Sequence, residues 1–225
     1  MIDNAFRAQL PRFTAPLIAL YQRLHWTPNH VTALGFAIAL LASAAVASGH
    51  LWVAFGLWWV SRLADGTDGL LARETGQESD FGAYFDIVLD MAAYGAMVLG
   101  FAAYFPAYVW HWMAMLFLYI LCIASALALG MQEAKREMEP RDDRGLRLGA
   151  GLAEGGETGI AYSLFLLFPG ALGVLATIWV IVLATTVIAR TALAYRGLSP
   201  SASPEAPPPP PPPSPGASAP PQTVE

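Results

Sequence analysis

The chain contains several separate stretches of about 20 mostly apolar residues, the length that an α-helix needs to cross the hydrocarbon core of a bilayer. These spans cover residues 31–49, 51–71, 82–104, 107–131, 157–170 and 172–194. Turn signals such as Ser48-Gly49-His50 and Pro169-Gly170 separate them. The composition agrees, because 56% of the residues are hydrophobic and only 13% are charged. The sequence therefore predicts an all-α, polytopic membrane protein with six transmembrane helices.

Both ends of the chain differ from these spans. Residues 5–24 mix apolar side chains with Arg7, Arg12 and Arg23, which predicts an amphipathic helix lying in the membrane interface. This segment lacks the features of a cleaved signal peptide, so we expect it to be retained. We expect residues 1–198 to form one membrane domain. Residues 199–225, with seven consecutive prolines at 207–213, are expected to form a disordered, Pro-rich tail, or alternatively a ligand for a proline-reading partner.

The distribution of Lys and Arg predicts the orientation in the membrane. The basic residues gather toward one side of the predicted spans: Arg7, Arg12 and Arg23 precede the first span, Arg62 and Arg73 flank the connection between the second and third, residues from Lys135 to Arg147 fill the connection between the fourth and fifth, and Arg190 and Arg196 close the sixth. Cytoplasmic loops retain such residues, so both termini are expected on the cytoplasmic side of the inner membrane. An aromatic belt is expected at the opposite interface, formed by Trp52, Tyr104, Tyr108, Trp110 and Trp112.

Composition also excludes some classes of protein. The net charge of −5 and the absence of a basic stripe argue against nucleic-acid binding. The single cysteine, Cys122, has no second thiol to pair with, which excludes a disulfide framework and a cysteine metal site.

Acidic residues recur at helical spacing around the connection between the second and third spans. Asp65, Asp68, Gly69, Ala72 and Arg73 stand at i, i+3, i+4, i+7 and i+8, so they share one helix face. In the next helix, Gly82, Asp86 and Asp90 stand at i, i+4 and i+8. The short polar link at 74–80 predicts that the two helices are antiparallel neighbours. Four carboxylates would then converge on one cleft.

Ionised carboxylates at membrane depth are costly and need a compensating cation. Arg73 alone cannot neutralise four aspartates, and carboxylate oxygens are preferred ligands of Mg²⁺ and Mn²⁺. The pattern therefore predicts a two-metal site suited to in-line displacement at phosphorus. Gly69 and Gly82 would let a phosphate or nucleotide approach the helix backbones closely. Taken singly, an aspartate could instead cap a helix and a glycine could serve helix packing.

These residues resemble a known signature. Asp65-x-x-Asp68-Gly69-x-x-Ala72-Arg73, eight residues, then Gly82-x-x-x-Asp86-x-x-x-Asp90 is similar to the motif of the class I CDP-alcohol phosphatidyltransferases, a group that includes bacterial phosphatidylglycerophosphate and phosphatidylinositol-phosphate synthases. The segment Thr27-Pro28-Asn29-His30-Val31-Thr32 resembles the element that precedes the first span in many members. The resemblance extends over about residues 5 to 196.

The resemblance implies a homodimeric enzyme of phospholipid biosynthesis, in which an alcohol attacks the β-phosphorus of a CDP-linked donor such as CDP-diacylglycerol and releases CMP. It implies that Asp65, Asp68, Asp86 and Asp90 bind Mg²⁺ or Mn²⁺, and that Asp86 and Asp90 are catalytic, with Asp90 also the candidate base. A metal-bound carboxylate is a poor base, so we rank the metal role of Asp90 above its role as base. The CDP moiety would be surrounded by Gly69, Ala72, Arg73, Gly82, Asn29 and Thr32.

The acceptor alcohol is not fixed by these motifs. A phosphorylated acceptor such as glycerol 3-phosphate or inositol phosphate needs a cationic cradle, for which Arg141, Arg144 and Arg147 are candidates. These arginines could equally be topology markers. Glu154 and Glu157 could orient a polyol or amino alcohol, or could simply favour the positive end of a helix dipole.

Two other functions also place aspartates on membrane helices. A membrane prenyltransferase holds a Mg²⁺-diphosphate with Asp-rich motifs, but it predicts more spans and leaves Ala72, Arg73 and Gly82 unexplained. A divalent-cation carrier predicts ionisable residues or broken helices near mid-membrane. The aspartates of this chain instead cluster towards the predicted cytoplasmic side.

Overall fold

A computed structural model describes residues 14–136 and 155–198, and within these ranges all regular structure is helical. A helix at residues 14–23 precedes the long helices. The elements that follow are α2 (Pro28–Ala47), α3 (Leu51–Thr75), α4 (Asp80–Tyr104), the 3₁₀ turn η1 (Pro106–Tyr108), α5 (Val109–Lys135), α6 (Gly155–Leu167), the 3₁₀ turn η2 (Pro169–Ala171) and α7 (Leu172–Leu198). Residues 5–13 of the predicted amphipathic helix and the predicted tail at 199–225 lie outside the described residues.

Local sequence signals set the helix ends around the predicted site. Pro28 occupies the first turn of α2, where its missing N–H costs no hydrogen bond. Gly76 ends α3 in the left-handed conformation, with φ of 64°. Ser79 caps α4, because its hydroxyl accepts a hydrogen bond from the Gly82 N–H at 3.0 Å. The chain therefore reverses direction between α3 and α4, as the sequence predicted.

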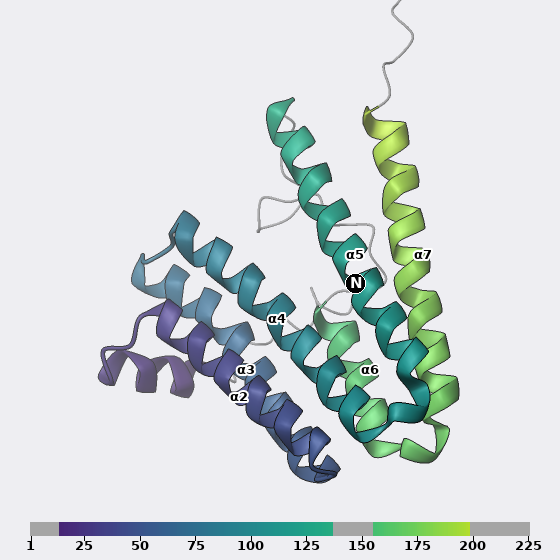
Figure 1. The fold of residues 1–225 in the computed structure, drawn as a ribbon. Helices are drawn as coiled ribbons and strands as arrows, with labels where there is room; N and C mark the ends of the chain where they lie inside the picture. The colour runs from purple at the N-terminus through teal and green to yellow at the C-terminus, as the bar shows by residue number, and fades with distance from the viewer. Residues whose placement is uncertain (1–13, 137–154, 199–225) are drawn as a thin grey trace, which may run out of the picture.

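The helices pack in two groups that diverge toward the upper end of Figure 1. Helix α2 packs against both α3 and α4, and α5 packs against α7. Helix α6 contacts α3 and α7, and so connects the groups. The predicted direct packing of α3 on α4 is largely replaced by packing of each on α2, because small residues of α2 such as Ala39 and Ala42 allow close approach. Helices α3 and α4 meet mainly through side chains.

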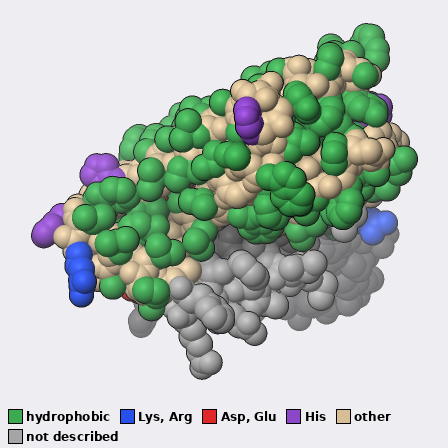
Figure 2. Space-filling view, turned by 90° about the horizontal axis from the view of Figure 1, so that it is seen from below, with side chains coloured by type: hydrophobic (Ala, Val, Ile, Leu, Met, Phe, Trp, Pro, Cys, Tyr) green, Lys and Arg blue, Asp and Glu red, His purple; other side chains and the backbone are tan. Residues whose placement is uncertain are grey.

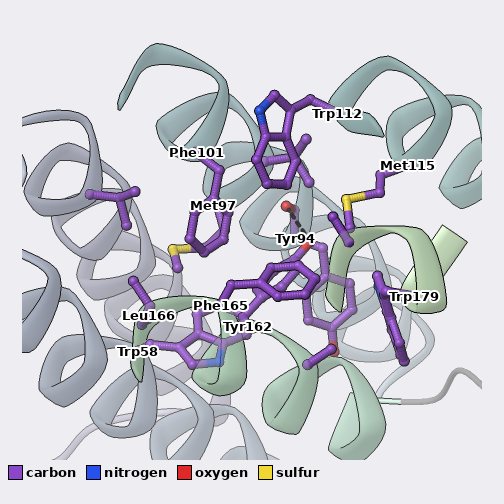
Figure 3. Packing of buried hydrophobic residues seen from close by; sticks show 14 of the residues in the cluster. Trp58, Tyr94, Met97, Phe101, Trp112, Met115, Tyr162, Phe165, Leu166 and Trp179 are labelled. Carbon is purple, nitrogen blue, oxygen red and sulfur yellow. Dashed lines mark hydrogen bonds between the residues drawn. The ribbon is translucent and has the colours of Figure 1, made fainter. Parts of the chain in front are cut away.

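Aromatic side chains fill the core between these helices. Figure 3 shows Trp58 of α3, Tyr94 and Phe101 of α4 and Tyr162 of α6 converging. The Trp58 and Tyr162 ring centroids are 5.2 Å apart, and the Tyr162 hydroxyl donates to the Tyr94 carbonyl at 3.0 Å. Lipid tails are as apolar as these side chains, so close packing and such internal hydrogen bonds, rather than escape from water, hold the helices together. This core lies next to the acidic residues of α3 and α4.

Within residues 14–136 and 155–198, four helical stretches have the length and apolar composition to cross a membrane, namely Pro28–Ala47, Asp80–Tyr104, Pro106–Lys135 and Pro169–Leu198. Of the six predicted spans, two fall short of these requirements. Helix α3 is long enough at 25 residues but carries the charged residues of the predicted site, and the described part of α6 has only 13 residues. The chain is a multi-pass membrane protein, and six spans remain a prediction.

The molecular surface agrees with a membrane setting. Figure 2 shows a face covered mainly by hydrophobic side chains, with Lys and Arg at its edges. Arg73, Lys135 and Arg196 occupy the last turns of α3, α5 and α7, whose ends lie at the same side of the molecule in Figure 1. Which side of the membrane this is remains a prediction.

The predicted aromatic belt is confirmed only in part as a set of exposed side chains. Trp52 and Trp110 of the predicted aromatic belt are 75% and 76% exposed, but Trp112 is buried and donates from Nε1 to the Phe105 carbonyl at 3.0 Å. Trp112 therefore belongs to the core instead of the belt.

In the helix at 14–23, Ile18 and Tyr21 pack against α2 and α3, while Leu20 is 47% exposed. The placement of this helix in the membrane interface remains a prediction.

The contact between α2 and α4 depends on Gly100. A Cβ atom at this position would lie 2.6 Å from the Ser43 carbonyl oxygen, which is closer than such atoms approach. We expect Gly100→Ala to push the helices apart and to lower the free energy of unfolding by about 1–3 kcal/mol, measured by denaturant unfolding in detergent. Gly56→Ala is the control, because a Cβ there meets nothing within 4 Å. Equal stability of the two variants would contradict the close packing.

Candidate active site

The residues of the predicted signature lie at the adjoining ends of α3 and α4. Arg62 of α3 contacts Asp65 on its own helix and Asp90 on α4, and Asp68 and Asp86 lie about one turn from these two on the same helices. The structure thus brings Asp65 and Asp90 together at Arg62. It places them over the aromatic core, between helices that meet through side chains.

Asp68 is held in place by two hydrogen bonds. Its side chain is buried, and its Oδ2 atom accepts a hydrogen bond from the Thr32 hydroxyl at 2.6 Å. Its Oδ1 atom lies 2.6 Å from the Gly69 N–H, which donates to it. Hydrogen bonds to a charged acceptor are stronger than neutral ones. Thr32, predicted to contact the nucleotide, here ties α2 to the carboxylate of Asp68, and its role toward CDP remains a prediction.

The other residues predicted to surround CDP lie in two neighbouring pairs. A Cβ atom at Gly82 would be 3.4 Å from Asn29 Oδ1, so Asn29 at the start of α2 lies directly beside the start of α4. A Cβ atom at Gly69 would be 3.5 Å from the guanidinium of Arg73. Both glycines therefore leave backbone accessible next to a polar side chain, which suits binding of a phosphate or nucleotide. Ala72 lies on the same helix, α3, and is half-buried.

The residue that sequence reasoning missed is Arg62. It was taken as a marker of topology, but its Nη1 atom pairs with Asp90 and lies 3.5 Å from Asp65 Oδ2. Its guanidinium carbon lies 4.6 Å from the Trp58 ring and 5.2 Å from the Tyr94 ring. The signal was present in the sequence, because Arg62 interrupts an apolar run and stands three residues before Asp65. An arginine at such a depth requires a partner.

The four carboxylates have the chemistry of a divalent-cation site, since hard oxygen ligands suit Mg²⁺ and Mn²⁺. Within residues 14–136 and 155–198, however, no three acidic, histidine or cysteine side chains are arranged around one point as a metal cage would need. Arg62 instead occupies oxygens of Asp65 and Asp90. The carboxylate oxygens suit a divalent cation in kind, and in this structure Arg62 is the charge that engages two of the four aspartates.

The candidate acceptor residues are only partly described. Arg141, Arg144, Arg147 and Glu154 lie outside the described residues. Glu157 lies in the first turn of α6, and its Oε2 atom is buried without a hydrogen-bond partner among the described residues.

A second arginine was also taken only as a topology marker. Arg190 of α7 is buried at 5% exposure and donates to the Cys122 carbonyl at 2.6 Å. It borders a cavity of about 210 Å³ between α5 and α7, which Ser125, Gln132 and Thr191 also line. A buried guanidinium at the wall of a cavity is a suitable group to receive an anion.

Known proteins share this sequence and this fold. A family model described as CDP-alcohol phosphatidyltransferase matches residues 25–192. The phosphatidylinositol phosphate synthase of Mycobacteroides abscessus is 28% identical over 186 residues, covering 80% of this chain and 82% of the relative. The inner membrane protein YnjF of Escherichia coli is 30% identical over 174 residues, covering 75% of this chain and 83% of the relative.

Solved structures show the same fold. A crystal structure of Mycobacterium tuberculosis phosphatidylinositol phosphate synthase with CDP-DAG bound superimposes with a TM-score of 0.62 at 24% identity, covering 82% of this chain and 94% of that one. The same enzyme in complex with manganese and citrate gives a TM-score of 0.57 at 24% identity, covering 81% and 88% of the two chains. With the signature residues assembled on α3 and α4 and the family match spanning α2 to α7, the chain belongs to the CDP-alcohol phosphatidyltransferase family and is a membrane-bound transferase of substituted phosphate groups.

Proposed function

We propose that this enzyme transfers a phosphatidyl group from CDP-diacylglycerol to a hydroxyl group of a phosphorylated polyol, with inositol phosphate the first candidate and glycerol 3-phosphate the second. The observation that supports the reaction type is the pairing of Asp65 and Asp90 through Arg62, with Asp68 and Asp86 about one turn away on the same two helices. A prenyltransferase or a cation carrier would leave Ala72, Arg73 and Gly82 without a role. Family membership gives no support to either alternative.

The proposed reaction is a displacement at the β-phosphorus of the donor. The acceptor oxygen forms a new bond to this phosphorus, the bond from phosphorus to the CMP oxygen breaks, and the acceptor proton is lost to Asp90 or to water. Gly69 and Gly82 leave room for the diphosphate, beside Arg73 and Asn29. Thr32 holds Asp68 in place through its hydroxyl.

Two divalent cations, Mg²⁺ or Mn²⁺, are proposed to bind to the four aspartates. When bound, such ions neutralise charge on the diphosphate and acidify the attacking hydroxyl. Two observations support this assignment: the oxygen-only donor set, and the manganese present in the structure of the Mycobacterium tuberculosis enzyme.

The preference for a phosphorylated acceptor rests on Arg190. Its guanidinium borders the cavity between α5 and α7, and arginine contacts phosphate oxygens through paired donors. Two similar proteins, from Mycobacteroides abscessus and Mycobacterium tuberculosis, are named phosphatidylinositol phosphate synthases. Homodimer formation, implied by the resemblance, is retained as part of the proposal.

A panel of acceptors tests the proposed function. Purified protein is incubated with labelled CDP-diacylglycerol, Mg²⁺ or Mn²⁺, and inositol phosphate, glycerol 3-phosphate, free inositol, glycerol or serine in turn. We expect CMP and a labelled lipid product only with metal and a phosphorylated polyol. If none of the acceptors on the panel supports CMP release, the proposed function is contradicted. Preference for free inositol or serine would contradict the proposed class of acceptor.

The same assay tests the role of Arg190. We expect Arg190→Lys to raise the KM for the phosphorylated acceptor about 10-fold or more while the KM for CDP-diacylglycerol stays near that of the parent, because lysine lacks the paired donors. Arg196→Lys is the control, since Arg196 lies in the exposed last turn of the same helix. An unchanged KM for the acceptor would remove Arg190 from the proposal.

A further inference from the structure

Arg62 is the positive charge that directly contacts the acidic cluster in the described part of the chain. Its Nη1 atom pairs with Asp90 Oδ1 and lies 3.5 Å from Asp65 Oδ2, so one nitrogen joins a carboxylate of α4 to one of α3. The side chain is only 9% exposed. Charges removed from water interact much more strongly than charges at a surface. The pairing is therefore a major electrostatic feature of the cluster.

Two aromatic rings hold the guanidinium in this position. Trp58 precedes Arg62 by one helical turn and Tyr94 follows Asp90 by one turn, so each ring lies next to one side of the ion pair. Both rings attract a cation through their electron-rich faces. The Tyr94 hydroxyl also accepts from Nη1 at 3.4 Å, and both rings belong to the rigid aromatic core. The aromatic rings of Trp58 and Tyr94 therefore hold Arg62 in addition to its two carboxylate partners.

From these contacts we infer that Arg62 is a built-in counter-charge that competes with divalent cations for Asp65 and Asp90, and so sets how tightly the enzyme binds metal. The inference rests on the proposed metal site. The oxygens that Arg62 engages belong to two of the four proposed ligands, and its positive charge repels any cation that approaches them. With Arg62 in place, the four aspartates are partly neutralised before a metal ion binds.

A role in orienting the carboxylates would predict the opposite change in metal affinity when Arg62 is lost. If Arg62 served only to orient the two carboxylates toward the metal, its loss would weaken metal binding, typically about 10- to 100-fold for such supporting residues. A counter-charge predicts tighter binding after its loss. Measuring metal affinity therefore separates the two roles without relying on enzyme turnover.

The test compares the full-length parent with Arg62→Gln, Arg62→Lys and Arg196→Gln in detergent. Arg196→Gln makes the same charge change at an exposed position in the last turn of α7, outside the proposed site. Mn²⁺ affinity is measured from the electron paramagnetic resonance signal of free Mn²⁺, and the unfolding temperature is measured in EDTA and in saturating Mn²⁺. We expect Arg62→Gln to bind Mn²⁺ at least about 10-fold more tightly, because a like charge has been removed at short range.

The unfolding temperatures provide a second measurement. Arg62→Gln is expected to unfold at a lower temperature than the parent in EDTA and to regain most of the difference in Mn²⁺, since the cation replaces the lost charge. Arg62→Lys keeps the charge, so its Mn²⁺ affinity is expected to stay near that of the parent, as is that of Arg196→Gln. If Arg62→Gln does not fold, the double variant Arg62→Gln with Asp90→Asn is expected to fold, because it also removes the uncompensated carboxylate.

Each other outcome counts against the inference. Equal or weaker Mn²⁺ binding by Arg62→Gln overturns it, as does failure of Mn²⁺ to restore stability or of the double variant to fold. If the parent and all variants fail to bind Mn²⁺, the proposed metal site itself falls, and the inference falls with it. If the parent binds Mn²⁺ and the variants bind equally, only the role of Arg62 is refuted.

Discussion

Replacement of Asp65 by asparagine is expected to lower metal-dependent CMP release by at least about 100-fold, because even the supporting residues of a metal site cost about 10- to 100-fold when removed. Asp65 Oδ2 lies 3.5 Å from Arg62 Nη1, the atom that also pairs with Asp90, so its carboxylate belongs to the contact between α3 and α4. Asparagine keeps the size of the side chain and removes its charge. CMP release from labelled CDP-diacylglycerol, measured over a range of Mn²⁺ concentrations, checks the expectation.

Asp80→Asn provides the matched control. Asp80 is an exposed residue in the first turn of α4, outside the signature, and the substitution is chemically identical. We expect its activity to remain close to that of the parent. Undiminished CMP release by Asp65→Asn would refute the proposed metal site, and an equal loss in both variants would show a general effect of charge at this end of the molecule.

Asp90→Asn is expected to lower kcat by about 10²–10⁴-fold if the carboxylate accepts the proton of the attacking hydroxyl. Asp90 is the carboxylate most closely engaged by Arg62, and this contact joins α4 to α3. Steady-state kinetics at saturating metal and donor, together with Mn²⁺ affinity, separate loss of a base from loss of a ligand. A fall in kcat with Mn²⁺ binding retained supports the role as base.

Two further results would decide against that role. Near-normal turnover of Asp90→Asn with metal bound would exclude Asp90 as the base. If instead raising the Mn²⁺ concentration fully restored turnover, Asp90 would act as a metal ligand alone. Asp80→Asn serves again as the control for an aspartate-to-asparagine change on α4.

The helices, their approximate bounds and the identity of the acidic cluster could be predicted from the sequence. Apolar runs bounded by turn residues specify membrane helices, because every backbone polar group in lipid must be satisfied within the helix. The i, i+3 and i+4 spacing places Asp65, Asp68 and Gly69 on one face without any tertiary information. The α3 helix was also identified as a helix, although its charged residues keep it from meeting the composition of a membrane span.

The partners of the charged side chains were decided only by the tertiary structure. Arg62 and Arg190 look like topology markers in the sequence, because the sequence does not show whether a basic side chain faces solvent or a buried partner on another helix. Packing of α3 and α4 against α2 brings Asp90 to Arg62, and packing of α7 against α5 brings Arg190 to the Cys122 carbonyl. Trp112, expected at the membrane interface, was similarly placed in the core by its neighbours Phe101 and Phe165.

The sequence by itself therefore determined which residues can do chemistry, namely the aspartates and glycines of α3 and α4, because spacing along one helix fixes their common face. Only the tertiary structure decided which charge compensates them. Periodicity describes a single helix, whereas the contact between Arg62 and Asp90 joins residues 28 positions apart on two helices that both pack against α2.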